Sequence, residues 1–409
     1  MDYFHFNQYS SLLLPGWVQG LVFFVLLLGR SIKWERPADR FGAFLLLACT
    51  LYVSQWMLGF AGWYDAHTWQ TTVMFYTPWA NFTLFGPLVY FTFISLTNAQ
   101  FEWKKQYWLH FAPFLLLSIE PLVVFGHDML WEHWLKGNAL MYFDGTRGSW
   151  AEYINTTSVP LLQFLHVFER IHLLAYLVLT ILSFNQYRKY LRENFTNEDR
   201  YALGWLRMLL FVFVIGFGLS WLTNVLSWVI ELDYVGSWYS HFIMSLTIYM
   251  LSVRLYALGP ERLRALRFEP GPVSEAITLR DTPSSAEPDD EIQDLSAQLA
   301  GFLEKEKPFL DPDLNLAALA GKLKTSPAML SKTINLIHKQ NFNDYINGFR
   351  CREVIRRLEA GEHTHFTFLS IALDAGFNSK ATFNRAFKKY SGESPRQFVS
   401  NHEMRRLTS

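Results

Sequence analysis

The feature that most constrains this chain is a series of apolar stretches, each long enough to cross a lipid bilayer as a helix. A helical span needs about 20 predominantly apolar residues. Seven stretches qualify, at residues 11–29, 40–60, 73–96, 107–125, 160–183, 208–229 and 238–257. The first is expected to be a retained span and not a secretory signal, because no Lys or Arg precedes Arg30. The sequence therefore predicts a seven-helix transmembrane bundle within residues 1–259.

Basic residues are concentrated in alternate loops between these stretches. The first, third and fifth loops contain Arg30, Lys33, Arg36 and Arg40, then Lys104 and Lys105, then Arg188, Lys189, Arg192, Arg200 and Arg207. The other loops carry only Lys136 and Arg147. Because cytoplasmic loops are enriched in Lys and Arg, the amino terminus is predicted to lie outside and the carboxyl terminus in the cytoplasm.

Several ionisable residues fall inside predicted spans, where a charge is costly unless it is paired or faces a cavity, and four of them are candidates for a signal-sensing site. They are Glu120 in one span and His166, Glu169 and Arg170 in the next. The last three share one helical face. Two interpretations stay open, a structural ion pair between helices and a site that senses a signal. Metal binding is the weaker hypothesis, since this helix supplies at most two ligands.

Two further segments connect or flank the predicted helices. The longest predicted outside segment, residues 126–159, could form a cap that receives a ligand, and a solvated loop explains it equally well. After the last span, residues 260–290 begin with a basic juxtamembrane piece, which anionic headgroups would attract. The Pro-, Ser- and acid-rich remainder is predicted to be a flexible linker.

Residues 291–409 have the apolar periodicity of a soluble helical domain, with two similar helix-turn-helix patterns. In the first, the turn includes Lys324, and Ser326 caps the following helix. In the second, the turn contains Gly376, and Ser379 caps the following helix. A helix of about 18 residues between them would be about 27 Å long, comparable with the roughly 34 Å that separates successive major-groove faces.

The charge of this part of the chain favours nucleic acid as a partner. Lys plus Arg and Asp plus Glu are balanced at 36 each in the whole chain. Residues 320–409 nevertheless contain fifteen Lys and Arg against seven Asp and Glu. A local excess of this size is the pattern expected for contact with phosphates.

The residues of both patterns resemble one family. The run LSIALDAGFNSKATFNRAFKKYSGESPRQF, with LAALAGKLKTSPAMLSKTIN and NFNDYINGFR before it, resembles the AraC/XylS-type DNA-binding domain. Such a domain after seven spans is similar to membrane-anchored members of that family. The resemblance implies an all-α regulator that binds double-stranded promoter DNA, with RNA polymerase and a second copy of the chain as expected partners.

The resemblance also implies which side chains face the DNA grooves. They are Ala328, Met329, Ser331 and Lys332 in the first motif, and Lys380, Ala381, Thr382, Asn384 and Arg385 in the second. The spacing of Lys380, Asn384 and Lys388 places these three opposite the apolar face of their helix. Asn384 and Arg385 have the chemistry to read adenine and guanine edges. Lys388 is expected to touch phosphate at most.

No catalytic pattern competes with this interpretation. The sequence has no Gly-rich phosphate loop, no Gly-x-Ser-x-Gly elbow and no HExxH, so we expect neither an enzyme nor a cofactor or metal site. The sequence predicts a one-component transcription regulator of the bacterial inner (cytoplasmic) membrane that responds to an unidentified signal. The alternative is a transporter or membrane enzyme with an attached DNA-binding regulatory domain, and a scaffold with an inert DNA-binding domain is a third hypothesis.

Overall fold

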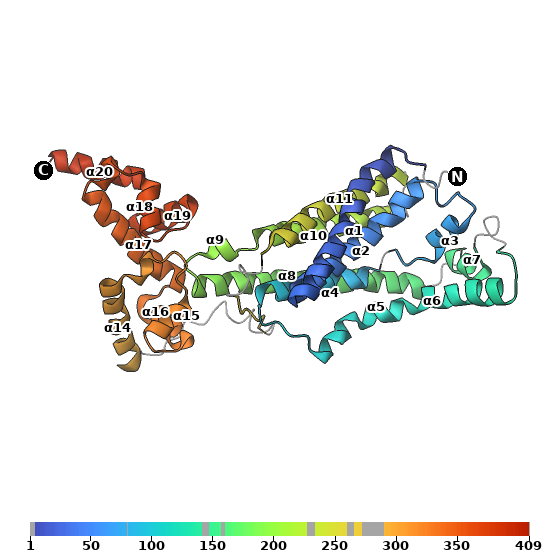
Figure 1. The fold of residues 1–409 in the computed structure, drawn as a ribbon, viewed down its shortest axis with the longest axis horizontal. Coiled ribbons are helices and arrows are strands. Elements are labelled where there is room, and N and C mark those ends of the chain that lie inside the picture. The colour runs from blue at the N-terminus through green and yellow to red at the C-terminus, as the bar shows by residue number, and fades with distance from the viewer. Residues whose placement is uncertain are drawn as a thin grey trace. The chain divides into compact units, whose positions relative to one another are not determined.

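The computed structural model describes residues 5–79, 81–140, 147–156, 160–226, 234–259, 266–271 and 290–408 (Figure 1). Within these ranges the chain is helical and contains no strand, which confirms the predicted all-α class. The chain separates into two compact units, one formed by residues 1–183 with 203–270, the other by residues 184–202 with 271–409. The second unit therefore includes a segment between two predicted spans.

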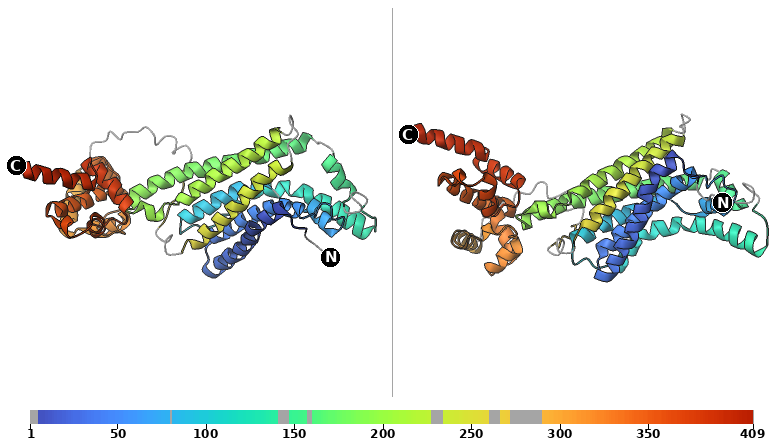
Figure 2. Two further views of the ribbon diagram at one scale, coloured as in Figure 1. Left: turned by 90° about the horizontal axis from the view of Figure 1, so that it is seen from above. Right: turned by 45° about the horizontal axis from the view of Figure 1, so that its top comes forward.

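The first unit is built from long apolar helices that lie side by side (Figure 2). Its principal helices are α1 (Gln8–Trp34), α2 (Pro37–Phe60), α4 (Phe82–Thr97), α8 (Pro160–Asn194, which continues into the second unit), α10 (Gly204–Leu226) and α11 (Tyr234–Ala257). α1, α2 and α11 pack against one another, α2 contacts α4, and α10 contacts α11. Small residues permit this approach, since a Cβ atom at Gly16 would lie 2.7 Å from the Ser245 carbonyl oxygen.

Four helical stretches among the described residues are long and apolar enough to cross a membrane. They are Gln8–Trp34, Pro37–Phe60, Lys105–Leu135 and Val167–Asn194. Two shorter apolar helices, Phe82–Thr97 and Gly204–Gly218, accompany them. Helix α11 has 24 residues but carries His241 and Arg254, and it is not among the four. Four of the seven predicted spans thus meet this criterion.

The span predicted over residues 73–96 is not one continuous helix. The structure has α3 (Trp69–Tyr76) and α4, with Thr77 between them in an extended conformation at ψ 127°. Pro78 explains the interruption, because a residue that precedes proline is pushed out of the helical region and proline itself has no backbone N–H to donate. The prediction of a single helix here was wrong.

The span predicted over residues 107–125 extends further than the apolar pattern suggested. Helical structure runs from Lys105 to Leu135 through η1 (Lys105–Phe111), α5 (Ala112–Leu117), α6 (Ile119–Phe125) and the π-helix η2 (Gly126–Leu135). The predicted outside segment 126–159 therefore begins inside a helix, and it also contains α7 (Ser149–Thr156). The buried carboxylate of Asp128 on η2 joins this helix to α3 and α7. It accepts hydrogen bonds from the Tyr76 hydroxyl at 3.0 Å and from the Ala151 N–H at 2.9 Å.

The predicted juxtamembrane and linker segment, residues 260–290, lies mostly outside the described residues. Residues 266–271 are described, and they pack against the end of α4 in the first unit. The Phe268 N–H donates to the Thr97 carbonyl at 3.1 Å, and the Ala99 N–H donates to the Leu266 carbonyl at 2.9 Å. Since Leu266 and Phe268 are buried, apolar packing holds this part of a segment that the sequence assigned to lipid headgroups.

The second unit is a set of short helices around two apolar cores. Its helices are α9 (Glu198–Tyr201), α14 (Asp290–Glu306), η3 (Pro308–Leu310), α15 (Leu316–Lys322), α16 (Pro327–His338), α17 (Phe342–Glu359), η4 (Glu362–Thr364), α18 (Phe368–Asp374), α19 (Lys380–Ser391) and α20 (Pro395–Thr408). One core joins α14, α15 and α16 to the first half of α17. The other joins the second half of α17 to α18 and α19. Each helix-turn-helix motif thus has its own core on a shared central helix.

Candidate nucleic-acid interface

The first helix-turn-helix motif consists of α15 and α16, as the sequence predicted. Between the two helices Lys324 adopts a left-handed conformation, at φ 55°. The Ser326 hydroxyl accepts from the Met329 N–H at 3.1 Å, and Pro327 occupies the first helical turn. A hydroxyl cap followed by proline is a favourable helix start, so the sequence fixes where α16 begins.

The second motif consists of α18 and α19. Its turn contains Gly376 at φ 95°, a conformation that L side chains rarely adopt. The Ser379 hydroxyl accepts from the Thr382 N–H at 3.2 Å and so starts α19. Both predicted caps and both predicted turns are therefore present.

The predicted linker helix between the motifs is α17, with 18 residues. At 1.5 Å per residue its length is about 27 Å. The two motifs lie toward opposite ends of α17 (Figure 1). The second helix of each motif, α16 or α19, is therefore connected to the other through the single helix α17.

The structure brings most of the predicted groove-facing side chains to the surface. Exposed residues are Ala328 and Lys332 on α16, and Lys380, Ala381, Asn384, Arg385 and Lys388 on α19. Met329 and Ser331 are half-buried, and Thr382 is buried. On α19 the apolar side chains of Phe383 and Phe387 point into the core, so the polar face opposite them is free of that core.

Two predicted contact residues on α19 form contacts with acidic side chains from the α8–α10 connection. Arg385 Nη2 lies 3.1 Å from a carboxylate oxygen of Glu198 and 3.9 Å from one of Asp199. The Thr382 hydroxyl donates to the Asp199 carboxylate. Glu198 and Asp199 were not identified from the sequence, where only the basic residues of this loop were used to orient the chain. The sequence feature that could have identified them is an Asn-Glu-Asp step inside a predominantly basic loop.

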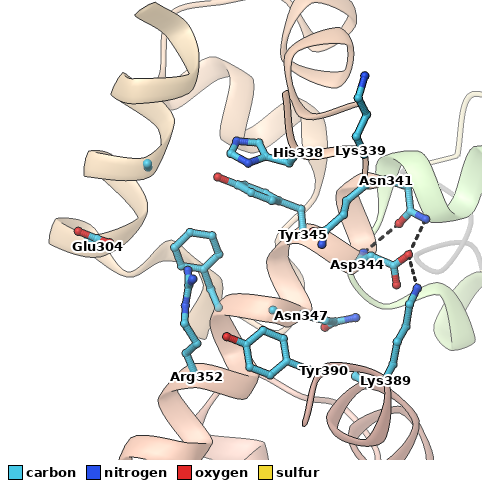
Figure 3. Close-up of a pocket in the computed structure, with 15 residues that line it drawn as sticks. Glu304, His338, Lys339, Asn341, Asp344, Tyr345, Asn347, Arg352, Lys389 and Tyr390 are labelled. Carbon is cyan, nitrogen blue, oxygen red and sulfur yellow. Dashed lines mark hydrogen bonds and ion pairs between the residues drawn. The ribbon is translucent and has the colours of Figure 1, made fainter. Parts of the chain in front are cut away.

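A second lysine near the end of α19 already has a partner within the domain. Lys389 Nζ lies 2.7 Å from a carboxylate oxygen of Asp344 on α17. The same carboxylate accepts from Asn341 Nδ2 at 2.9 Å, and Figure 3 shows both side chains directed at Asp344. These residues border a cavity of about 770 Å³, whose lining includes Glu304, Tyr345 and Arg352. Lys388 on the same helix is also exposed.

Arg350 on α17 is a buried residue that the sequence analysis did not single out. Its side chain is 1% exposed and donates from Nε to the Phe309 carbonyl at 2.7 Å and from Nη2 to the Asp311 carbonyl at 2.8 Å. Nη1 lies 3.3 Å from Asn347 Oδ1. Burial lowers the pKa of Arg350 to about 10. The sequence feature that could have identified Arg350 is the presence of an arginine among the apolar positions of a helix.

The four residues proposed for signal sensing fall in the first unit, and the structure describes them in part. The Arg170 guanidinium lies 5.5 Å from the centre of the Phe82 ring, and both residues line a mostly apolar cavity of about 480 Å³ between α4, α8 and α10. Glu169 is half-buried on the same helix and Glu120 is exposed on α6. The side chain of His166 lies outside the described part of the chain. Across the described residues, no group of three His, Cys, Asp or Glu could hold a metal ion.

Comparison with known proteins agrees with the geometry of the second unit. Residues 319–401 match the model of a family described as a helix-turn-helix domain, of the AraC type. This part of the chain is therefore similar to AraC-type helix-turn-helix domains. The matched range runs from within α15 into α20 and contains every predicted groove-facing residue. No curated protein and no solved structure matches the chain. The domain supports DNA as a partner and transcription regulation as the activity.

Proposed function

We propose that this protein is a membrane-bound, one-component transcription regulator that binds promoter DNA through α16 and α19. The observation that carries the proposal is the pair of capped helix-turn-helix motifs, matched by a family model, in a chain that also has four helices able to cross a membrane. One polypeptide then combines a DNA-binding domain with a membrane anchor.

In this proposal the second helix of each motif enters a major groove. Lys332 on α16 and Asn384 and Arg385 on α19 contact base edges, because lysine and arginine can donate to guanine and asparagine can pair with adenine. Lys388, further along α19, contacts phosphate. The net positive charge of residues 320–409 supplies the attraction to DNA that does not depend on sequence.

We further propose that the protein crosses the bacterial cytoplasmic membrane seven times, with its amino terminus outside. The four long apolar helices, the two shorter apolar helices and the 24-residue α11 support this number. The alternation of basic loops supports the orientation. Such a topology places the helix-turn-helix domain and the loop with Glu198 and Asp199 on the same, cytoplasmic side.

The membrane part is proposed to receive the signal and to pass it to paired DNA-binding domains. Arg170 is a charged side chain beside an apolar cavity, and charged residues within spans usually serve a function. A second copy of the chain and RNA polymerase are the proposed protein partners. Pairing is favoured because a Pro- and Ser-rich linker transmits proximity better than rotation.

Selection of binding sites from a random duplex library tests the DNA-binding function directly. The purified full chain in detergent should enrich a defined sequence, and a Lys332→Glu/Arg385→Glu variant should not. If neither the parent nor a Glu198→Gln/Asp199→Asn variant recovers any duplex, the DNA-binding function is refuted. A reporter fused after residue 259 should be active only in the cytoplasm, and a periplasmic signal there would refute the seven-span topology.

A further inference from the structure

The segment that joins α8 to α10 is held against the helix-turn-helix domain by buried hydrogen bonds. We call residues 195–200 the connecting segment. Asn343 Nδ2 on α17 donates to the carbonyls of Phe195 and Thr196, at 3.0 and 2.9 Å. The Thr196 hydroxyl donates to the Leu314 carbonyl at 2.8 Å and lies 3.2 Å from Arg350 Nη2. The backbone and the Thr196 hydroxyl of the connecting segment are thus hydrogen-bonded to residues of the helix-turn-helix domain.

The residues that join the connecting segment to the domain are buried on both sides of the contact. Phe195 is 5% exposed and Thr196 is 1% exposed, while Asn343 and Arg350 beneath them are 7% and 1% exposed. Phe195 also forms an isolated bridge with Asn315, the cap residue of α15. Since buried polar groups require partners, the connecting segment satisfies donors that the domain would otherwise expose to water.

Anchored in this way, the connecting segment brings two carboxylates onto the DNA-reading face of α19. Glu198 and Asp199 contact Arg385, and Asp199 also accepts from the Thr382 hydroxyl. Both partners on α19 are residues whose family counterparts face the groove. A phosphate that approached Arg385 would meet two like charges, and juxtaposed like charges oppose association. A base edge would have to compete with the Glu198 carboxylate for the guanidinium.

We propose that the connecting segment is an autoinhibitory element, which competes with duplex DNA for Thr382 and Arg385 of α19. The inference rests on the proposed DNA-binding function and adds its regulation. The connecting segment follows directly from α8, whose earlier residues include Glu169 and Arg170. A change in that helix can therefore release or restore the contact without passing through the Pro-rich linker.

A pair of charge-matched variants tests the competition in the full chain. Glu198→Gln/Asp199→Asn removes the two carboxylates from α19. Glu193→Gln/Glu306→Gln removes two carboxylates from the same unit, which pair with Lys189 on α8 and with Lys305 on α14. Each protein is titrated, in detergent, with a labelled duplex of random sequence and with any duplex enriched by selection. The first variant should bind about tenfold more tightly than the parent, which corresponds to about 1.4 kcal/mol, and the control less than about threefold.

A third variant loosens the anchor without changing charge or altering the domain. Thr196→Val removes the hydroxyl that bonds to Leu314 and Arg350 and keeps the side-chain shape. It should raise DNA affinity about fivefold, as expected when hydrogen bonds with a net contribution of about 1 kcal/mol no longer hold the connecting segment.

The outcomes separate this inference from the proposed function. If the parent and all variants bind duplex DNA with the same affinity, or if both charge variants gain equally, the autoinhibitory contact is refuted while DNA binding stands. If neither the parent nor any variant binds duplex DNA, the proposed function is refuted, and the inference with it. Binding by the Glu198→Gln/Asp199→Asn variant alone would support both.

Discussion

Arg350 Nη2 lies 3.2 Å from the Thr196 hydroxyl, and this contact joins the central helix of the DNA-binding domain to the connecting segment. The same guanidinium donates to the carbonyls of Phe309 and Asp311. One buried side chain therefore links three parts of the second unit that are distant in sequence. The pKa of Arg350 is lowered to about 10 by burial, so it stays protonated near neutral pH.

Arg350→Met should destabilise the second unit by about 3 kcal/mol or more, because it leaves several buried acceptors without donors. Arg352→Met is the matched control, since Arg352 is exposed on the same helix. Hydrogen exchange of α17 peptides in the full chain, at increasing urea, measures the loss. Equal protection in the two variants would show that the buried hydrogen bonds contribute little to stability.

Gly376→Ala should destabilise the second motif by about 2–3 kcal/mol, through a left-handed backbone and a steric clash together. A Cβ atom at this position would collide with the Phe309 carbonyl oxygen and lie 2.9 Å from Arg350 Nε. Gly392 also has a positive φ but no neighbour within 4 Å. Gly392→Ala should therefore cost only about 1 kcal/mol. Thermal unfolding of both variants separates the clash from the backbone strain.

Arg385→Ala and Lys332→Ala should relax the choice of base at one position each, by about 1–3 kcal/mol. The measurement is the ratio of affinities for matched and mismatched duplexes, in which any effect on the connecting segment cancels. Lys388→Ala should keep that ratio and reduce the salt dependence of binding by about one phosphate contact. An unchanged ratio for Arg385→Ala would mean that another face of α19 reads the bases.

The second unit should lose stability in mild acid through His338 on α16. Burial lowers the pKa of His338 from 6.5, and the ring lies against Tyr345 with a nitrogen 3.1 Å from the Ser296 hydroxyl. Because the folded state disfavours protonation, the neutral ring contributes its full stability above pH 6.5, and this is lost as pH falls through the lowered folded pKa. His338→Gln should reduce the difference in melting temperature between pH 7.5 and pH 5, an effect kept small by partial exposure. An unchanged difference would assign the acid sensitivity to other groups.

Glu169→Gln tests whether the charged residues of α8 carry the signal. An uncompensated charge in a span costs about 2.5–3.5 kcal/mol, enough to shift a two-state equilibrium by about two powers of ten. The variant should hold transcriptional output constantly high or low in cells, with normal membrane insertion. DNA affinity of a Glu169→Gln/Glu198→Gln/Asp199→Asn variant should equal that of Glu198→Gln/Asp199→Asn. A normal response by Glu169→Gln would make Glu169 structural.

The sequence by itself determined the elements whose signals are local. Ser326 and Ser379 mark the starts of α16 and α19, and Gly376 marks a turn, because capping and left-handed turns depend on a few adjacent residues. Apolar length located most of the long helices for the same reason. It failed at Pro78, where one residue overrides hydropathy, and beyond Phe125, where the helix continues without an apolar pattern.

Only the tertiary structure decided which distant residues meet on the face of α19 that is proposed to read DNA. Glu198 and Arg385 belong to the same unit but are far apart in the sequence, and no periodicity links an acidic step in one loop to a helix so distant in the chain. The burial of Arg350 and Asn343 places the connecting segment there, and burial is a property of packing between segments. The sequence therefore specified a DNA-binding domain, while its packing placed two carboxylates on the helix that is proposed to read DNA.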